Sequence, residues 1–245
     1  MMNRTLCAIL LAGAAVSAAS ATVIGISNIG GGLVMNSGPV GAGAFGNAQT
    51  DWSSVSLASV NATLNASGVA TNGRITFVAA DTDHGLAFMT LIDEELVGGL
   101  GSAGNVHLDT VGNDTSSAFF NTLGTGFAVA PMGTDSRIAT GDLQWNSNGG
   151  GSGFAWADLV NGNTQSFRFT FVNGTILGLN DIATFQFATW TGTTWSVISV
   201  PDALLSFSAT GDYGFAANVV PAPSVILAAG IPALAASTLR RRRTR

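Results

Sequence analysis

The sequence contains no lysine, and its basic charge comes from nine arginines. Six of them lie at the two ends of the 245-residue chain: Arg4, Arg240, Arg241, Arg242, Arg243 and Arg245. Residues 22–218 hold all fourteen acidic residues and only three arginines, which gives this region a formal charge of −11. Because an acidic surface without lysine repels phosphate backbones, the composition argues against nucleic acid as a partner.

Cysteine occurs only once, as Cys7. This residue falls within a predicted signal peptide, so we expect no disulfide in the mature protein, although export usually permits disulfides. The sequence also lacks the G-x-S-x-G and H-E-x-x-H motifs, and its two histidines are His84 and His107. We therefore predict that the protein is not an enzyme. A Ser–His–Asp set assembled only by folding stays open as an alternative.

The N-terminus has the three parts of a secretory signal peptide, which we assign to residues 1–21. Arg4 supplies the positive charge, residues 6–16 form the apolar stretch, and Ala19 and Ala21 are the small residues of the cleavage site. The apolar stretch is too short to span a membrane. We predict export through the secretion translocon, followed by cleavage by signal peptidase after Ala21.

The C-terminal residues 219–245 contain a Pro-x-Pro motif, an apolar run at 225–239 and an arginine block at 240–245. As a helix, the apolar run is about 22 Å long. The hydrocarbon core of a bilayer is ~30 Å thick, so the run predicts a marginal membrane helix. Arginines beside a membrane segment stay in the cytoplasm, which predicts that the acidic domain lies outside.

This arrangement resembles the PEP-CTERM sorting signal of Gram-negative bacteria. The matching motif is Val220, Pro221, Ala222, Pro223 and Ser224, and the matching cytoplasmic anchor is Arg240, Arg241, Arg242, Arg243 and Arg245. Ala222 stands where the family has the glutamate that names it. The resemblance implies transient anchoring in the inner membrane and cleavage near the motif by an exosortase-like membrane protease. It also implies delivery to the cell surface or to extracellular polysaccharide. The alternative is a plain anchor helix that is never cut.

Residues 22–218 read as strands, and we expect one all-β exported domain with a β-sandwich or jelly-roll-like fold. A signal helix and a membrane helix would flank it. Residues 166–172 alternate phenylalanine with polar residues, which places one face against a core and the other in water. Residues 86–92 are apolar on both faces, as in a central strand. Because charged helix formers are scarce, we expect no helix inside this domain.

Turn signals separate the expected strands. An Asn-Gly pair at 72–73 predicts a hairpin leading into residues 74–79. Further turns are expected at 161–163 and at 191–194, and such spacings are typical of a sandwich with about ten or more strands. The glycine-rich segment 30–46 is expected to form a long early loop.

Two kinds of residue are candidates for binding. Asp81 and Asp83 lie two residues apart in a predicted turn and carry oxygen ligands that suit Ca²⁺, and we expect no other cofactor. We favour the alternative of a solvated turn, because the rest of an EF-hand loop is missing. The tryptophans are candidates for stacking on sugar rings, but tryptophan in a sandwich more often belongs to the core: Trp52, Trp145, Trp156, Trp190 and Trp195.

Three functions stay open. The leading hypothesis is a non-enzymatic surface or matrix protein of a Gram-negative-type bacterium, associated with exopolysaccharide or a biofilm. The second is a carbohydrate-binding β-sandwich module, and the third is a secreted hydrolase. The first rests on the resemblance of the tail and on the missing catalytic motifs.

Overall fold

The computed structural model describes the chain between Val23 and Val220, with gaps: residues 23–27, 32–41, 43–46, 51–52, 54–93, 104–123, 126–145, 151–171, 185–198 and 212–220. The predicted signal peptide with its cleavage residues lies outside this part, as do the motif residues after Val220, the apolar run and the arginine block. Within the described part, no helix combines the length and apolarity needed to cross a membrane.

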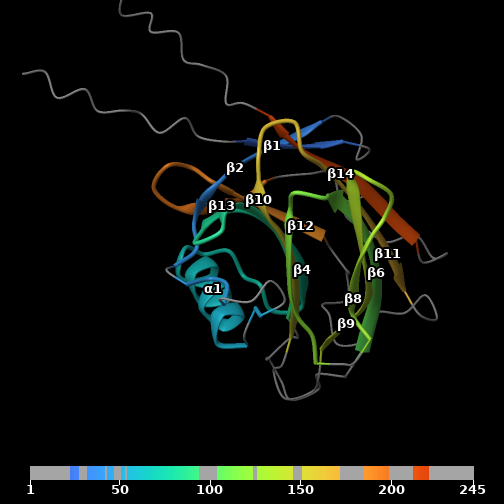
Figure 1. Cartoon of the computed structure of the whole chain (residues 1–245). Helices are drawn as coiled ribbons and strands as arrows, with labels where there is room; N and C mark the ends of the chain where they lie inside the picture. Colours follow the sequence, from blue (N-terminus) through green and yellow to red (C-terminus); the bar gives the residue numbers. More distant parts are fainter. Residues whose placement is uncertain are drawn as a thin grey trace, which may run out of the picture.

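Two seven-stranded β-sheets build the domain (Figure 1). The first, which we name the outer sheet, is antiparallel throughout. Its strands run from edge to edge in the order β2 (Leu33–Asn36), β1 (Val23–Ser27), β14 (Asp212–Val220), β11 (Thr164–Phe171), β6 (Gly104–Asn113), β9 (Ser136–Trp145) and β8 (Ala128–Pro131).

We name the second sheet the inner sheet. Its order is β13 (Trp195–Val197), β12 (Phe185–Trp190), β4 (Arg74–Thr82), β5 (Gly85–Asp93), β10 (Ser152–Leu159) and β7 (Ser117–Asn121), and β3 (Gly38–Pro39) also pairs with β4. Its pairs are antiparallel, except that β4 is parallel to both β12 and β3. The expectation of a predominantly β domain is confirmed.

The strands of the outer sheet alternate between core and solvent. In β11, Phe167 and Phe169 are buried, whereas Ser166 and Arg168 are exposed. This confirms the period of two expected for this segment, since successive side chains of a strand point to opposite faces. The outer sheet therefore has one apolar face and one polar face.

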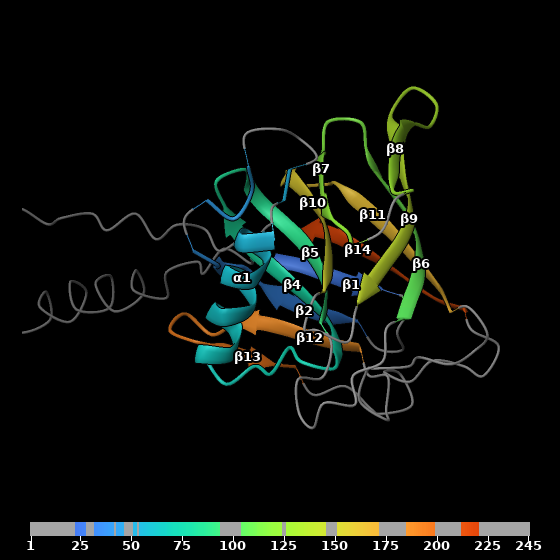
Figure 2. The same cartoon turned by 90° about the horizontal axis from the view of Figure 1, so that it is seen from below.

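The inner sheet is buried on both faces. One face packs on the outer sheet in a core rich in phenylalanine, where the ring centroids of Phe77 (β4) and Phe215 (β14) are 4.9 Å apart. The other face, which includes Val78 and Met89, packs with the helix α1 (Ser54–Ala66) in a second core. Figure 2 shows the resulting order of α1, inner sheet and outer sheet. β5 is thus a central strand that is apolar on both sides, as predicted.

Helix α1 lies where the sequence predicts only strands, so the prediction of a helix-free domain is wrong. Leu57, Val60 and Leu64 follow a helical spacing and lie in the second core. The helix contains no charged residue, and packing of this apolar stripe stabilises it instead. It ends in a Schellman motif, in which the Val69 N–H donates to Leu64 O and Gly68 adopts a left-handed φ of 87°.

Two of the predicted turns are confirmed and two other predictions are wrong. Residues 191–194 join β12 and β13 in a hairpin, and residues 161–163 lead from β10 in the inner sheet to β11 in the outer sheet. The pair at 72–73 forms no hairpin, because the element before it is α1 rather than a strand. The segment 30–46 contains β2 and β3, whose short length left little periodic pattern to recognise.

The first and last described strands are neighbours. β1 pairs with β14 over five residues, and the outermost pair joins Val23 to Val220. β14 pairs with β11 on its other side. In addition, the Val219 N–H donates to Asn163 O at 2.9 Å, and Val219 O accepts from the Gly162 N–H at 3.0 Å. The last strand thus runs two residues past the predicted domain boundary, and the two ends of the described chain lie side by side.

Gly112 in β6 tests the packing between the sheets. A Cβ at this position would come within 2.8 Å of the ring of Trp156, which is fully buried and donates through Nε1 to Thr110 at 2.8 Å. We expect Gly112→Ala to lower the free energy of unfolding by about 1–3 kcal/mol, measured by urea denaturation. Gly25→Ala is the matched control, because a Cβ there meets only Asn218 O at 3.9 Å. Equal losses in the two variants would contradict this packing.

Candidate functional site

The open face of the outer sheet carries a compact group of polar side chains. His107 and Asp109 lie two residues apart on β6, and Thr140 and Asp142 lie two apart on β9. The register pairs His107 with Asp142 and Asp109 with Thr140, so the four side chains occupy one block of the sheet. We name these four residues the histidine cluster. All four are half-buried, which leaves them accessible to solutes.

A chain of hydrogen bonds orders the histidine cluster. Asn105 donates through Nδ2 to Asp142 Oδ2 at 3.3 Å, and Asp142 Oδ1 lies 2.8 Å from His107 Nδ1. On the other side of the imidazole, Nε2 lies 3.3 Å from Thr140 Oγ1 and 3.4 Å from Asp109 Oδ1. Thr140 donates its hydroxyl proton to Asp109 at 2.6 Å. The ring is therefore fixed between two carboxylates.

Thr140, His107 and Asp142 have the order of a hydroxyl–imidazole–carboxylate triad, but two observations argue against acyl transfer. The Thr140 hydroxyl is closer to Asp109 than to His107, so it donates its proton to Asp109 rather than to the imidazole. Thr140 also lies within β9, which pairs with β6 on one side and β8 on the other. The backbone N–H groups beside Thr140 belong to a strand that is paired on both sides, so they do not converge to form an oxyanion hole. The geometry suits binding better than nucleophilic catalysis.

The second histidine has a different environment. His84 lies in the turn between β4 and β5, with Nδ1 3.6 Å from Asp158 Oδ2, and Ser117 donates to the same oxygen in a short hydrogen bond. Because Asp158 stands between the serine and the histidine, these three residues do not form a Ser–His–Asp relay. The imidazole packs instead on Phe119, with 4.7 Å between the ring centroids.

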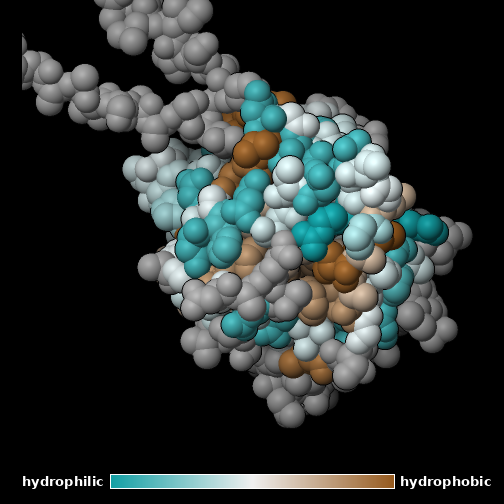
Figure 3. Space-filling view, in the orientation of Figure 1, coloured by the Kyte–Doolittle hydropathy of each residue, from teal (hydrophilic) through white to brown (hydrophobic). Residues whose placement is uncertain are grey.

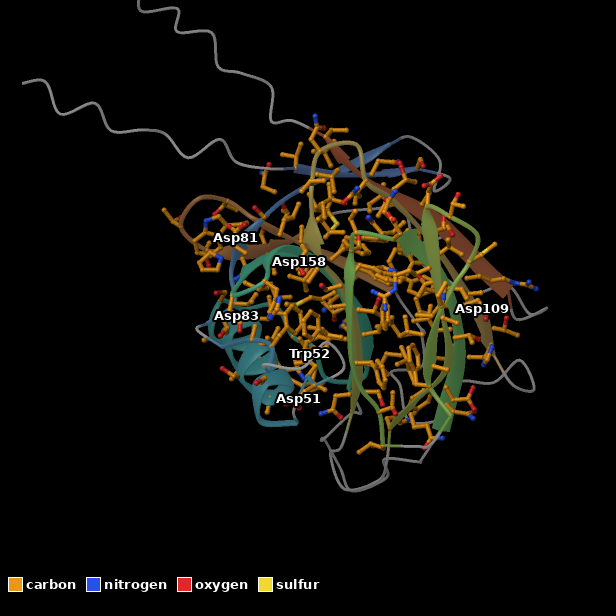
Figure 4. The ribbon with its side chains drawn as sticks, in the orientation of Figure 1. Asp51, Trp52, Asp81, Asp83, Asp109 and Asp158 are labelled. Carbon is orange, nitrogen blue, oxygen red and sulfur yellow. The ribbon has the colours of Figure 1, made fainter. Side chains whose placement is uncertain are left out.

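The predicted calcium ligands lie on another part of the surface. Asp81 is near the end of β4 and Asp83 is in the turn that follows, and both are exposed. Asp83 Oδ1 accepts a hydrogen bond from the Phe45 N–H at 3.2 Å. Figure 4 shows the two aspartates on the side of α1, whereas Asp109 lies on the opposite side. Across the described ranges, no three His, Cys, Asp or Glu side chains gather closely enough to hold a metal ion. Calcium at Asp81 and Asp83 stays a prediction.

Four of the five tryptophans belong to the cores, as predicted: Trp52, Trp145, Trp156 and Trp195. Trp190 is partly buried and meets Trp195 edge to face, with 5.5 Å between centroids. Figure 3 shows hydrophilic residues over much of the face in view, with hydrophobic residues in small patches. The described residues therefore present no row of exposed tryptophan rings for stacking on sugars.

Comparison with known proteins gives no match for this chain among protein-family models, curated proteins or solved structures. Its function must be inferred from its own residues.

The histidine cluster is absent from the sites predicted from the sequence. β6 does alternate Asn105, His107 and Asp109 with the apolar Val106 and Leu108, which is a signal for one polar face. Which strand lies beside β6 cannot be read from that alternation. In the chain, 22 residues with two other strands separate the end of β6 from the start of its partner β9.

Asp158 offers a test of the His84 region. It is the only non-glycine residue with positive φ in the described part, at 55°, and it lies where the register of β10 with β5 shifts. We expect Asp158→Val to destabilise the domain by about 1–3 kcal/mol, because a β-branched residue is strained in this conformation. Asp158→Asn tolerates the conformation and keeps an acceptor oxygen, so it should cost less. Thermal denaturation measures both, and equal losses would argue against the strain.

Proposed function

We propose that this chain is an exported, non-enzymatic surface or matrix protein, held transiently at the inner membrane by a PEP-CTERM-type tail. Signal peptidase would remove residues 1–21 after passage through the translocon. An exosortase-like protease would then cut near the motif 220–224. The released domain would join the cell surface or an extracellular polysaccharide.

The pairing of Val23 with Val220 is the observation that carries the proposal. The first strand begins two residues after the expected signal-peptidase site, and the last strand ends at the first residue of the expected sorting motif. A cut after Ala21 or after Val220 would remove no residue of either sheet. Both processing segments would also adjoin the same corner of the domain, since their flanking strands are neighbours.

The short spacing after β14 supports transient anchoring close to the membrane. Only residues 221–224 separate the last strand residue from the apolar run. Fully extended, four residues reach at most about 14 Å. An uncut tail would therefore hold the acidic domain near the bilayer, and release would require a cut within this segment.

A carbohydrate-binding module is the second candidate, and the open face of the outer sheet favours it. This face presents amide, carboxylate, guanidinium and hydroxyl groups on neighbouring strands, among them Asn105, Asp142, Arg168 and Thr170. Such groups hydrogen-bond well to the hydroxyls of polysaccharides. A glycan array would support this function if one glycan bound tightly, lost affinity with Asn105→Ala and kept it with Trp190→Ala.

Processing of the tail tests the leading proposal. In a bacterium that has an exosortase, we expect a chain with an epitope after Arg245 to lose the epitope and to end between Val220 and Val225, by mass spectrometry. In an isogenic strain without the protease, the chain should stay full length in the inner membrane. Replacing Pro221 and Pro223 by alanine should block the cut and keep the anchor. Retention of the epitope in both strains would contradict sorting by cleavage.

A further inference from the structure

We propose that the histidine cluster is an open binding site for a divalent transition-metal ion of the zinc class. The ligands would be His107 Nε2, Asp109 Oδ1 and Thr140 Oγ1, and water would complete the coordination from the solvent side. The site combines two side chains of the usual metal-binding types with a hydroxyl group as the third donor. It is independent of the proposed sorting of the tail.

Two of the three spacings among the donor atoms suit one ion. His107 Nε2 is 3.4 Å from Asp109 Oδ1 and 3.3 Å from Thr140 Oγ1. Zinc binds nitrogen and oxygen at about 2.0–2.2 Å in tetrahedral geometry, which places two ligand atoms roughly 3.3–3.6 Å apart. The third spacing, 2.6 Å between Thr140 Oγ1 and Asp109 Oδ1, is a hydrogen bond that would lengthen once the ion lies between them.

Asp142 prepares the imidazole for this role. Its Oδ1 lies 2.8 Å from His107 Nδ1, which assigns the proton of a neutral ring to Nδ1 and the lone pair to Nε2. Metal-binding histidines usually donate their second N–H to a carboxylate in this way, and that contact fixes both tautomer and orientation. Asn105 in turn donates to the other oxygen of Asp142 at 3.3 Å. Asp142 and Asn105 are therefore positioning residues.

The donor atoms of the site present lone pairs that a metal ion can use. Thr140 gives its proton to Asp109, so Thr140 Oγ1, Asp109 Oδ1 and His107 Nε2 all present lone pairs to the space between them. A metal ion between the three atoms would bind these lone pairs. Arg168 on β11 is paired with Asp109 on β6. The cluster and Arg168 together contain two carboxylates, those of Asp109 and Asp142, and one guanidinium. Nitrogen and oxygen donors together select a transition metal over Ca²⁺ or Mg²⁺.

Titration of Zn²⁺ into the full-length chain, purified in mild detergent and followed by calorimetry, tests the site. A Cys7→Ser background removes the only thiol. We expect one Zn²⁺ per chain, loss of binding in His107→Gln, and affinity about 10–100-fold weaker in Asp142→Asn. Circular dichroism would establish that each variant is folded.

His84→Gln is the matched control. It removes the only other histidine, which also lies beside a carboxylate but has its ring packed on a phenylalanine. We expect this variant to bind Zn²⁺ like the parent. Absence of saturable binding to the parent would overturn the proposal. Binding that survives in His107→Gln, or that disappears in His84→Gln, would overturn it as well.

Discussion

Burial of the inner sheet on both faces is the constraint on which the rest of the structure depends. Phe77 and Phe88 fill the core against the outer sheet, while Val78 and Met89 fill the second core with α1. Since α1 and the outer sheet cover the inner sheet, the outer sheet carries the open polar face of the described domain. β4 and β5 are therefore almost continuously apolar, whereas β6, β9 and β11 alternate. The histidine cluster lies on alternating strands because the polar side chains of these strands point to the open face of the outer sheet.

The order of strands in the outer sheet places the first and last described strands side by side. β14 lies inside the outer sheet, between β1 and β11, and cannot be lost without separating the two. Its final residue, Val220, is nevertheless at the margin of the sheet beside Val23. A domain closed in this way is compatible with removal of a segment at each end. With no cysteine after Cys7, its stability rests on the two cores and the strand ladders rather than on disulfides.

Local periodicity was enough to predict the longer strands β5 and β11, because burial on one face or on both faces determines the order of apolar and polar residues. β11 and β5 follow that order, with Phe167 and Phe169 inward in the first and apolar residues on both faces of the second. Helix α1 was missed because the prediction relied on charged helix-forming residues, and α1 contains none. Its signal is the apolar stripe of Leu57, Val60 and Leu64. The histidine cluster was missed because it depends on the pairing of β6 with β9. The residue pattern of one strand does not identify which distant strand pairs with it.

Cysteine accessibility measures the two-sided burial most directly, since Cys7 is the one cysteine in the sequence and can be replaced. In a Cys7→Ser background, Ser166→Cys places a thiol on the open face of the outer sheet, and Ala155→Cys places one on the face of the inner sheet that α1 covers. Under native conditions a maleimide should label Ser166→Cys rapidly and leave Ala155→Cys protected until urea unfolds the chain. Equally rapid native labelling at both positions would show that the inner sheet is open on that side, and would contradict the layered structure.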